Sequence, residues 1–242
     1  MAHFYLDEAL VTAAVGGRVS ISGAEARHAV TVSRIAVGET VSIGNGAGLV
    51  VTGPVLVAEH TELAIKVETV IEVARRAPAV FLAQALAKGD RDELAVQAAT
   101  ELGVDGVIPW TAARSIARWE GTKVAKGRDR WAAVVREATK QSLRAWQPDV
   151  LDLVTTKQLS RLTDGARMLV LEPTAALALA DLDLDDRDLI LAVGPEGGIA
   201  PQELEALAAA GADVVRLGSE VLRTSTAGPA ALAALAVKLG RW

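Results

Sequence analysis

From residue 79 onward, short apolar runs alternate with segments of helical periodicity, and this alternation constrains the fold more than any other feature of the sequence. The apolar runs occupy 79–86, 104–110, 168–172, 189–193 and 213–217. Helical patterns lie between or after them, at 90–102, 129–144 and 201–211 and from about 227 onward. Strand and helix units in this order predict an α/β domain whose sheet is mainly parallel and covered by helices on both faces.

Apolar spacing also predicts which face of two of these helices packs inward. Leu94, Ala98 and Leu102 lie four residues apart in the segment 90–102. In the segment 201–211 the inward residues are expected to be Leu204, Leu207 and Ala208.

The first 72 residues have a different pattern, with period-two alternation and turn residues. Leu63, Ile65 and Val67 alternate with polar or small residues, as in a half-buried strand. The runs 41–43 and 49–52 flank a glycine-rich turn and predict a hairpin. We therefore expect a small β-barrel-like domain at 1–72, a linker near Pro78, and an α/β domain at 78–242.

Composition excludes several classes of protein. The 242 residues contain no cysteine, so disulfides and thiolate chemistry are absent, and the three histidines have no metal-ligand spacing. No apolar run approaches the roughly 18 residues that a membrane span requires. The N-terminus lacks the basic and hydrophobic regions of a signal peptide. We expect a cytoplasmic protein that holds no metal and enters no membrane.

Two glycine-bearing loops mark the candidate site. The sequence GPEGG, residues 194–198, directly follows the apolar run 189–193, and LGSEVLRTSTA, residues 217–227, follows the run 213–217. Ligands of open α/β sheets bind beyond the carboxyl ends of strands, where such loops lie. Neither loop matches a dinucleotide or Walker pattern, and Glu196 is unfavourable beside a phosphate. The sequence thus favours a neutral or cationic ligand held largely by main chain.

A basic segment lies inside this acidic chain. Residues 110–147 carry nine Lys and Arg against three Asp and Glu, a local charge of +6 in a chain of net charge −5. Such a stripe is typical of proteins that bind a phosphate backbone, although a solvated helix face would look the same.

Together the two loops resemble the C-terminal signature of the SPOUT methyltransferases, and in particular that of the RsmE family. Further matches are HFY at 3–5, His28 with VTVSR at 30–34, TELGV at 100–104, Arg114-Ser115, and EATKQSLR at 137–144. These motifs cover nearly the whole chain in the family's order. One departure is Ser219-Glu220, where the family usually has a proline and a basic residue.

The resemblance implies a PUA-like, RNA-binding β-barrel followed by a parallel-sheet domain with a C-terminal trefoil knot. It also implies a homodimer that uses S-adenosylmethionine to methylate N3 of a uridine in 16S rRNA of the small ribosomal subunit. By position, the cofactor contacts are expected from Leu171, Glu172, Gly194, Glu196, Gly198, Leu217, Gly218, Leu222, Arg223 and Thr226. Arg223 is also the expected organising residue of the catalytic site, and Thr224 is expected to support the loop.

For RNA we expect contacts from Arg34, Arg114, Arg128, Arg136 and Arg144. Removal of the uridine N3 proton calls for a base, and Glu101, Glu172 and Glu196 are the candidates among which the sequence does not choose. Three other functions stay open at this point. The first is a SPOUT-type methyltransferase that acts on ribose 2′-hydroxyls, and the second is a non-catalytic RNA-binding protein. The third is a nucleotide-binding oxidoreductase with an atypical glycine loop, which would bind NAD.

Overall fold

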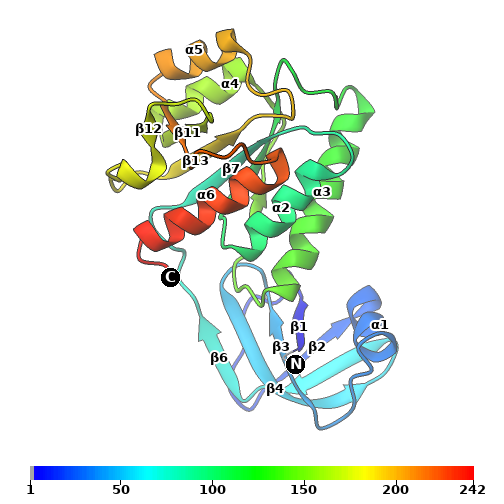
Figure 1. Cartoon of the computed structure of the whole chain (residues 1–242). Helices are drawn as coiled ribbons and strands as arrows, with labels where there is room; N and C mark the ends of the chain where they lie inside the picture. The colour runs from blue at the N-terminus through cyan, green and yellow to red at the C-terminus, as the bar shows by residue number, and fades with distance from the viewer. Residues whose placement is uncertain (1–2) are drawn as a thin grey trace. The chain divides into compact units, whose positions relative to one another are not determined.

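The computed structural model describes residues 3–242 and divides the chain into two compact units (Figure 1). One unit consists of the chain up to Arg75 together with Thr139–Gln147, and the other of Arg76–Ala138 with Pro148–Trp242. Within residues 3–242 no helix combines the length and the apolar character that crossing a membrane requires.

The first unit is built on a six-stranded sheet with one helix. Its elements are β1 (His3–Leu6), β2 (Arg18–Ser22), α1 (Gly23–Thr31), β3 (Thr40–Gly44), β4 (Leu49–Ala58), β5 (Glu62–Lys66) and β6 (Thr69–Glu72). The strand order is β1-β3-β4-β5-β2, with β6 also paired to β4, and only β1 and β3 run parallel. Fully buried Ile43, Val51, Leu63 and Ile65 contribute to its core, as their alternation along the strands requires.

Strand β4 is the centre of this unit because it pairs with three other strands. A register shift between Val55 and Val57 bends it. At Gly53 the backbone of Lys66 comes so close that an added Cβ would lie 1.8 Å from the Lys66 carbonyl oxygen. Only glycine permits this approach.

Residues 139–147 complete the first unit, although the expected range 78–242 assigned them to the α/β domain. The Gly48 amide donates to the Ala145 carbonyl, and the Gln147 amide donates to the Gly46 carbonyl, both at 2.9 Å. The Trp146 indole donates to the Val73 carbonyl at 2.6 Å. The segment is therefore joined to the first unit by backbone and side-chain bonds that the charge and helix pattern of 129–144 did not reveal.

The second unit contains an eight-stranded sheet in which every observed pairing is parallel. Its strands are β7 (Val80–Ala85), β8 (Gly106–Thr111), β9 (Asp149–Val150), β10 (Val154–Thr155), β11 (Arg167–Leu171), β12 (Leu177–Ala178), β13 (Leu189–Val193) and β14 (Asp213–Arg216). The order is β10-β8-β7-β13-β11-β14-β12, and β9 pairs with β8. The mainly parallel α/β sheet expected from the sequence is confirmed.

Helices cover both faces of this sheet, and the strand residues alternate between two cores. Leu189 and Leu191 of β13 pack in one core with residues of α2 (Arg91–Glu101), α3 (Thr122–Gln141) and α6 (Thr224–Lys238). Ile190 and Ala192 pack in the other core with Leu159 of α4 (Thr156–Ser160) and with α5 (Pro201–Ala209). Strand β13 is buried on both faces, and all five of its residues, 189–193, are apolar.

Three details of the helices differ from the sequence expectations. Leu94 is 55% exposed, and α2 instead buries Ala95, Val96 and Ala99. On α5, Leu207 is buried but Ala208 is exposed. Helix α3 begins at Thr122 rather than at 129, because the Trp119 ring packs directly on Gly127, and this tertiary contact outweighs the low helix propensity of glycine.

Candidate functional site

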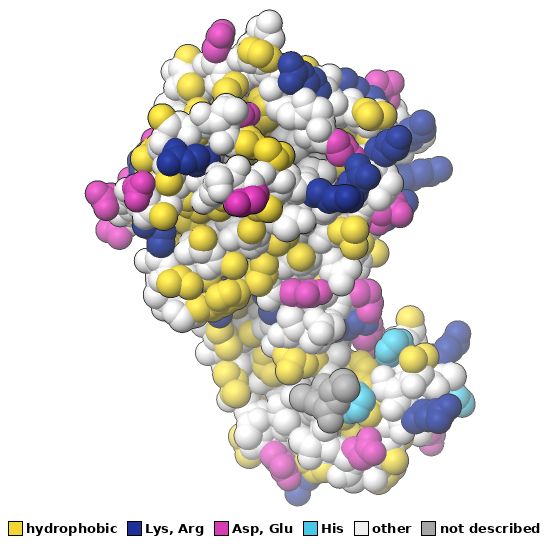
Figure 2. Space-filling view, viewed as in Figure 1, with side chains coloured by type: hydrophobic (Ala, Val, Ile, Leu, Met, Phe, Trp, Pro, Cys, Tyr) yellow, Lys and Arg dark blue, Asp and Glu magenta, His cyan; other side chains and the backbone are white. Residues whose placement is uncertain are grey.

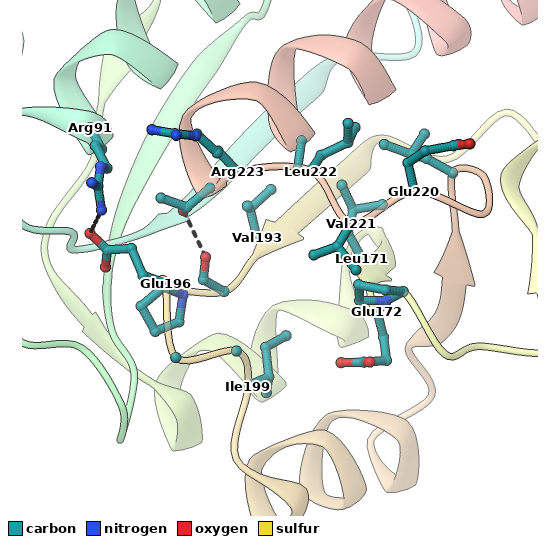
Figure 3. Close-up of a pocket in the computed structure, with 18 residues that line it drawn as sticks. Arg91, Leu171, Glu172, Val193, Glu196, Ile199, Glu220, Val221, Leu222 and Arg223 are labelled. Atoms are coloured by element: carbon teal, nitrogen blue, oxygen red, sulfur yellow. Dashed lines mark hydrogen bonds and ion pairs between the residues drawn. The ribbon is translucent and has the colours of Figure 1, made fainter.

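The carboxyl ends of three neighbouring strands form the candidate site, which lies wholly within the second unit. Strand β11 pairs with β13 on one side and with β14 on the other, all three in parallel, so that their following loops share one edge of the sheet. These loops enclose a pocket of about 590 Å³ (Figure 3). The arrangement follows the general rule that parallel sheets bind ligands beyond their carboxyl ends.

Most of the expected cofactor residues lie in the lining of this pocket. Those present are Leu171, Glu172, Gly194, Glu196, Gly198, Leu217, Leu222 and Arg223. Gly218 and Thr226 are not among the lining residues. The pocket also includes residues that the sequence reading did not assign to it, namely Arg91, Pro173, Val193, Pro195, Gly197, Ile199, Glu220, Val221, Thr224 and Ala227. Most of these flank the expected residues, whereas Arg91 comes from the start of α2 and no local signal pointed to it.

At two positions of the first loop, the backbone geometry requires glycine. A Cβ at Gly194 would lie 2.7 Å from Ile199 Cγ1 and 3.2 Å from the Ile199 amide nitrogen, so the loop folds back on itself there. Gly198 has φ +71°, in the left-handed region that other residues adopt only at a cost. The main chain is thus exposed to the pocket where side chains would otherwise fill it.

A buried hydroxyl joins the two glycine loops. Thr224 Oγ1 donates to the Gly194 carbonyl at 2.7 Å and accepts from Gln84 Nε2 of strand β7 at 2.8 Å. The same Gln84 nitrogen donates to the Ala85 carbonyl, which fixes the orientation of the amide. Thr224 is 6% exposed and Gln84 is fully buried. We name this chain of bonds, Gln84–Thr224–Gly194, the loop clasp.

Glu196 attaches the first loop to the start of α2. Its Oε1 accepts from the Lys88 amide at 3.1 Å and from the Arg91 guanidinium at 3.0 Å. Burial raises the pKa of the Glu196 carboxyl, but bonds from its own amide, the Lys88 amide and Arg91 outweigh burial and hold the pKa below its ordinary value. The carboxylate is therefore ionised at neutral pH and committed to the loop structure.

We expect Glu196→Gln to weaken this attachment at neutral pH but not in acid. A depressed folded-state pKa gives stability that is present above the ordinary Glu value and is lost as the pH falls through the folded-state value. The variant should therefore lose less than about 1 kcal/mol of unfolding free energy at pH 7, because solvent reaches the ion pair. Melting curves at pH 7 and at a pH well below the ordinary Glu pKa measure this. Exposed Glu205→Gln is the control, and equal losses at both pH values would contradict the assignment.

The structure separates the expected RNA contacts. Arg34 and Arg144 belong to the first unit, and Arg136 lies on α3. The exposed side chain of Arg128 pairs with Asp152. Arg114 contacts a glycine loop, since its Nη1 donates to the Gly197 carbonyl at 3.0 Å. Figure 2 shows Lys and Arg side chains gathered on the side of the second unit where α3 begins, with Asp and Glu side chains beside them.

The three candidate bases differ in position. Glu101 accepts from Gln97 on the surface of α2 and does not line the pocket. Glu172 lines the pocket and accepts from the Thr174 hydroxyl at 2.9 Å. Glu196 lines it as well but is held by Arg91. Among residues 3–242, no group of three or more His, Cys, Asp or Glu side chains is arranged to hold a metal ion.

The sequence and the fold have clear relatives. Residues 75–236 match the family model of the RNA methyltransferase domain. Ribosomal RNA small subunit methyltransferase E of Mycobacterium bovis is 43% identical over 99% of this chain and 92% of its own length. The protein of that name from Bacillus subtilis is 31% identical over 89% of this chain and 88% of its own. Among solved structures, ribosomal RNA small subunit methyltransferase E from Neisseria gonorrhoeae bound to S-adenosyl methionine has a TM-score of 0.88, at 28% identity over 98% of each chain.

Proposed function

Because the chain belongs to the ribosomal RNA small subunit methyltransferase E (RsmE) family, we propose that it transfers a methyl group from S-adenosylmethionine to 16S rRNA of the small ribosomal subunit. The acceptor in this proposal is N3 of a uridine. The observation that carries the proposal is the pocket in which two glycine loops meet at adjacent strand ends.

The pocket suits a cofactor with a flat adenosine and a cationic sulfonium. Main chain at Gly194, Gly197 and Gly198 leaves room for close approach of a planar group. Among the charged lining residues, three carboxylates (Glu172, Glu196 and Glu220) outnumber two guanidinium groups (Arg91 and Arg223). The excess of one negative charge favours a cation over a phosphate. When bound, S-adenosylmethionine supplies an electrophilic methyl group.

The chain's own residues then bind and orient the reactants. The loop clasp holds the two loops together, and the cofactor contacts are assigned to the expected set, with Thr226 and Gly218 acting from behind the lining. Arg223 is exposed at the start of α6 and positions the reacting groups. Methyl transfer depends mainly on holding the nucleophile in line with the methyl group. Of the carboxylates considered, Glu172 is the best placed to assist loss of the N3 proton.

The finer features of the fold are also part of the proposal. Strand β13 lies between β7 and β11, although β11 precedes it in the sequence, and the chain then crosses to β14 on the far side of β11. This order suits a trefoil knot around the glycine loops. The first unit acts as a PUA-like barrel that binds RNA, with Arg34 among its contacts, and Arg114, Arg128, Arg136 and Arg144 serve RNA from the basic segment.

We propose further that the protein acts in the cytoplasm as a homodimer. Figure 2 shows hydrophobic side chains gathered over α6. Val237 of α6 is 64% exposed and Leu94 of the contacting helix α2 is 55% exposed. Lys238 is the only charged residue in the whole of α6. An apolar surface of this kind suits a second copy of the chain.

The proposal is tested on small subunits from a strain that lacks this protein. Incubation with the protein and methyl-labelled S-adenosylmethionine should place label in 16S rRNA, and mass analysis of the digested RNA should identify 3-methyluridine. Arg223→Ala should label far more slowly while melting near the wild-type temperature. A 2′-O-methylated nucleoside would show instead that the protein methylates ribose 2′-hydroxyls. RNA binding without any label would indicate a non-catalytic protein.

A further inference from the structure

We propose that Arg91 and Arg114 form a binding site for RNA phosphates that brackets the first glycine loop and couples RNA binding to cofactor binding. The proposal rests on the methyltransferase function above and extends it. The two arginines come from different elements, since Arg91 begins α2 and Arg114 follows β8. They meet the loop at consecutive residues, Glu196 and Gly197.

Each arginine is attached to the loop by one strong bond. Arg91 Nη1 lies 3.0 Å from Glu196 Oε1, and Arg114 Nη1 lies 3.0 Å from the Gly197 carbonyl oxygen. A guanidinium group carries five N–H donors in a rigid fork. No other acceptor for either group is observed among residues 3–242. The Arg91 side chain is 39% exposed, and Arg114 is also exposed, so both keep donors directed to solvent.

The backbone beneath Arg114 is firmly held, so the side chain projects from a fixed base. The Ala113 amide donates to Glu203 of α5 at 2.9 Å. Arg118 donates to the carbonyls of Ala112 and Ala113 at 2.9 and 3.1 Å. Arg118 therefore serves the loop structure and not a ligand, although it belongs to the same basic segment. An ideal Cβ at Gly197 would be only 3.3 Å from Arg114 Cβ, so the two backbones pack closely.

Arg91 belongs to the pocket lining and is paired with Glu196, and Arg114 adds a second cation at the same loop, so the two guanidinium groups there outnumber the one carboxylate. An RNA strand that inserts a base into the pocket brings its flanking phosphates past this rim, where the net positive charge favours them. Arginine pairs with phosphate through parallel N–H bonds, which fix the direction of the fork. A phosphate bound to the free N–H groups of Arg114 would fix the guanidinium group, whose Nη1 donates to the Gly197 carbonyl. The loop would thus be held in its cofactor-binding conformation.

Linkage makes this idea quantitative. If RNA strengthens cofactor binding by some factor, the cofactor must strengthen RNA binding by the same factor. We expect a factor of about ten for the wild-type protein, within the usual range for coupled sites. Arg114→Met keeps the apolar stem but removes the donors, and it should reduce the factor to about one. Arg91→Met should reduce it as well.

The experiment measures two affinities, each in two states. S-adenosylhomocysteine serves as a cofactor probe that cannot react, and unmethylated small subunits serve as the RNA. Calorimetry gives the cofactor Kd with and without subunits, and filter binding gives the subunit Kd with and without cofactor. The matched control is Lys126→Met, because Lys126 is an exposed cation of the same segment without an observed contact to either glycine loop. It should weaken RNA binding and leave the coupling factor at about ten.

The outcomes distinguish failure of the proposed Arg91–Arg114 phosphate site from failure of the proposed methyltransferase function. Loss of coupling in Arg114→Met, with coupling retained in Lys126→Met, supports the proposed phosphate site. Arg114→Lys should bind subunits nearly as well as wild type and still lose most of the coupling, because an ammonium lacks the fork. If the wild-type protein binds both ligands with no coupling, the proposed phosphate site is wrong and the proposed function is unaffected. Wild-type protein that does not bind S-adenosylhomocysteine contradicts both.

Discussion

Replacing Thr224 with valine should weaken S-adenosylmethionine binding at least tenfold and lower the free energy of unfolding by about 2 to 4 kcal/mol. Valine has the shape of threonine but cannot bond, so the Gly194 carbonyl and the Gln84 amide would each lose a partner. A polar group left unpaired in a buried place costs about 1 to 3 kcal/mol. Calorimetric titration and denaturant unfolding measure the two effects.

Matched variants distinguish the effect of losing the Thr224 hydroxyl from the effect of any substitution at a threonine. Thr224→Ser keeps the hydroxyl and should recover most of the affinity. Thr69→Val changes an exposed threonine on strand β6 of the first unit, outside the pocket lining, and should bind the cofactor as the wild type does. If Thr224→Val loses stability but binds the cofactor normally, the loop clasp supports the fold without positioning the pocket.

Gly53→Ala should destabilise the first unit by about 3 kcal/mol or more. An alanine Cβ would lie 1.8 Å from the Lys66 carbonyl oxygen, which is backbone and cannot turn away. Strand β4 or β5 would have to shift, and overpacking of this kind typically costs 1 to 3 kcal/mol, occasionally more. Denaturant unfolding of the full chain, followed by tryptophan fluorescence and by far-UV circular dichroism, should show an earlier transition.

The control for that variant is Gly165→Ala, where no heavy atom lies within 4 Å of the added Cβ and the backbone has φ −115°. Its stability should stay within about 1 kcal/mol of wild type. Equal stability of Gly53→Ala and wild type would show that the two strands separate easily, contrary to the close approach observed.

The repeated strands and the pocket could be predicted because their signals are local. The run 189–193 has the bounds observed for β13, and the glycine loop after it lines the pocket. The loop clasp could not be predicted, since Gln84 and Thr224 are 140 residues apart and glutamine within an apolar strand carries no pairing information. Arg91 was missed for the same reason, because its partner Glu196 is 105 residues away.

The buried faces of the helices were harder to predict from the sequence than the positions of the helices. The spacing of Leu94 and Leu102 matches a buried stripe, yet Leu94 lies on the exposed side of α2. In an alanine-rich helix, small residues such as Ala95 and Ala99 can form the buried face, so the largest apolar residue does not identify it. The exposed leucine instead lies on the apolar surface that we assign to a second copy.

The completion of the first unit by residues 139–147 has a consequence for how the protein is made. A ribosome that has finished Arg75 must add about seventy more residues before that segment exists. At about 5 to 20 residues per second this takes roughly 4 to 14 seconds. During that interval the newly made sheet lacks the partners of Gly46, Gly48 and Val73. Synthesis order and folding order therefore differ, and the N-terminal part of the chain is finished from its middle.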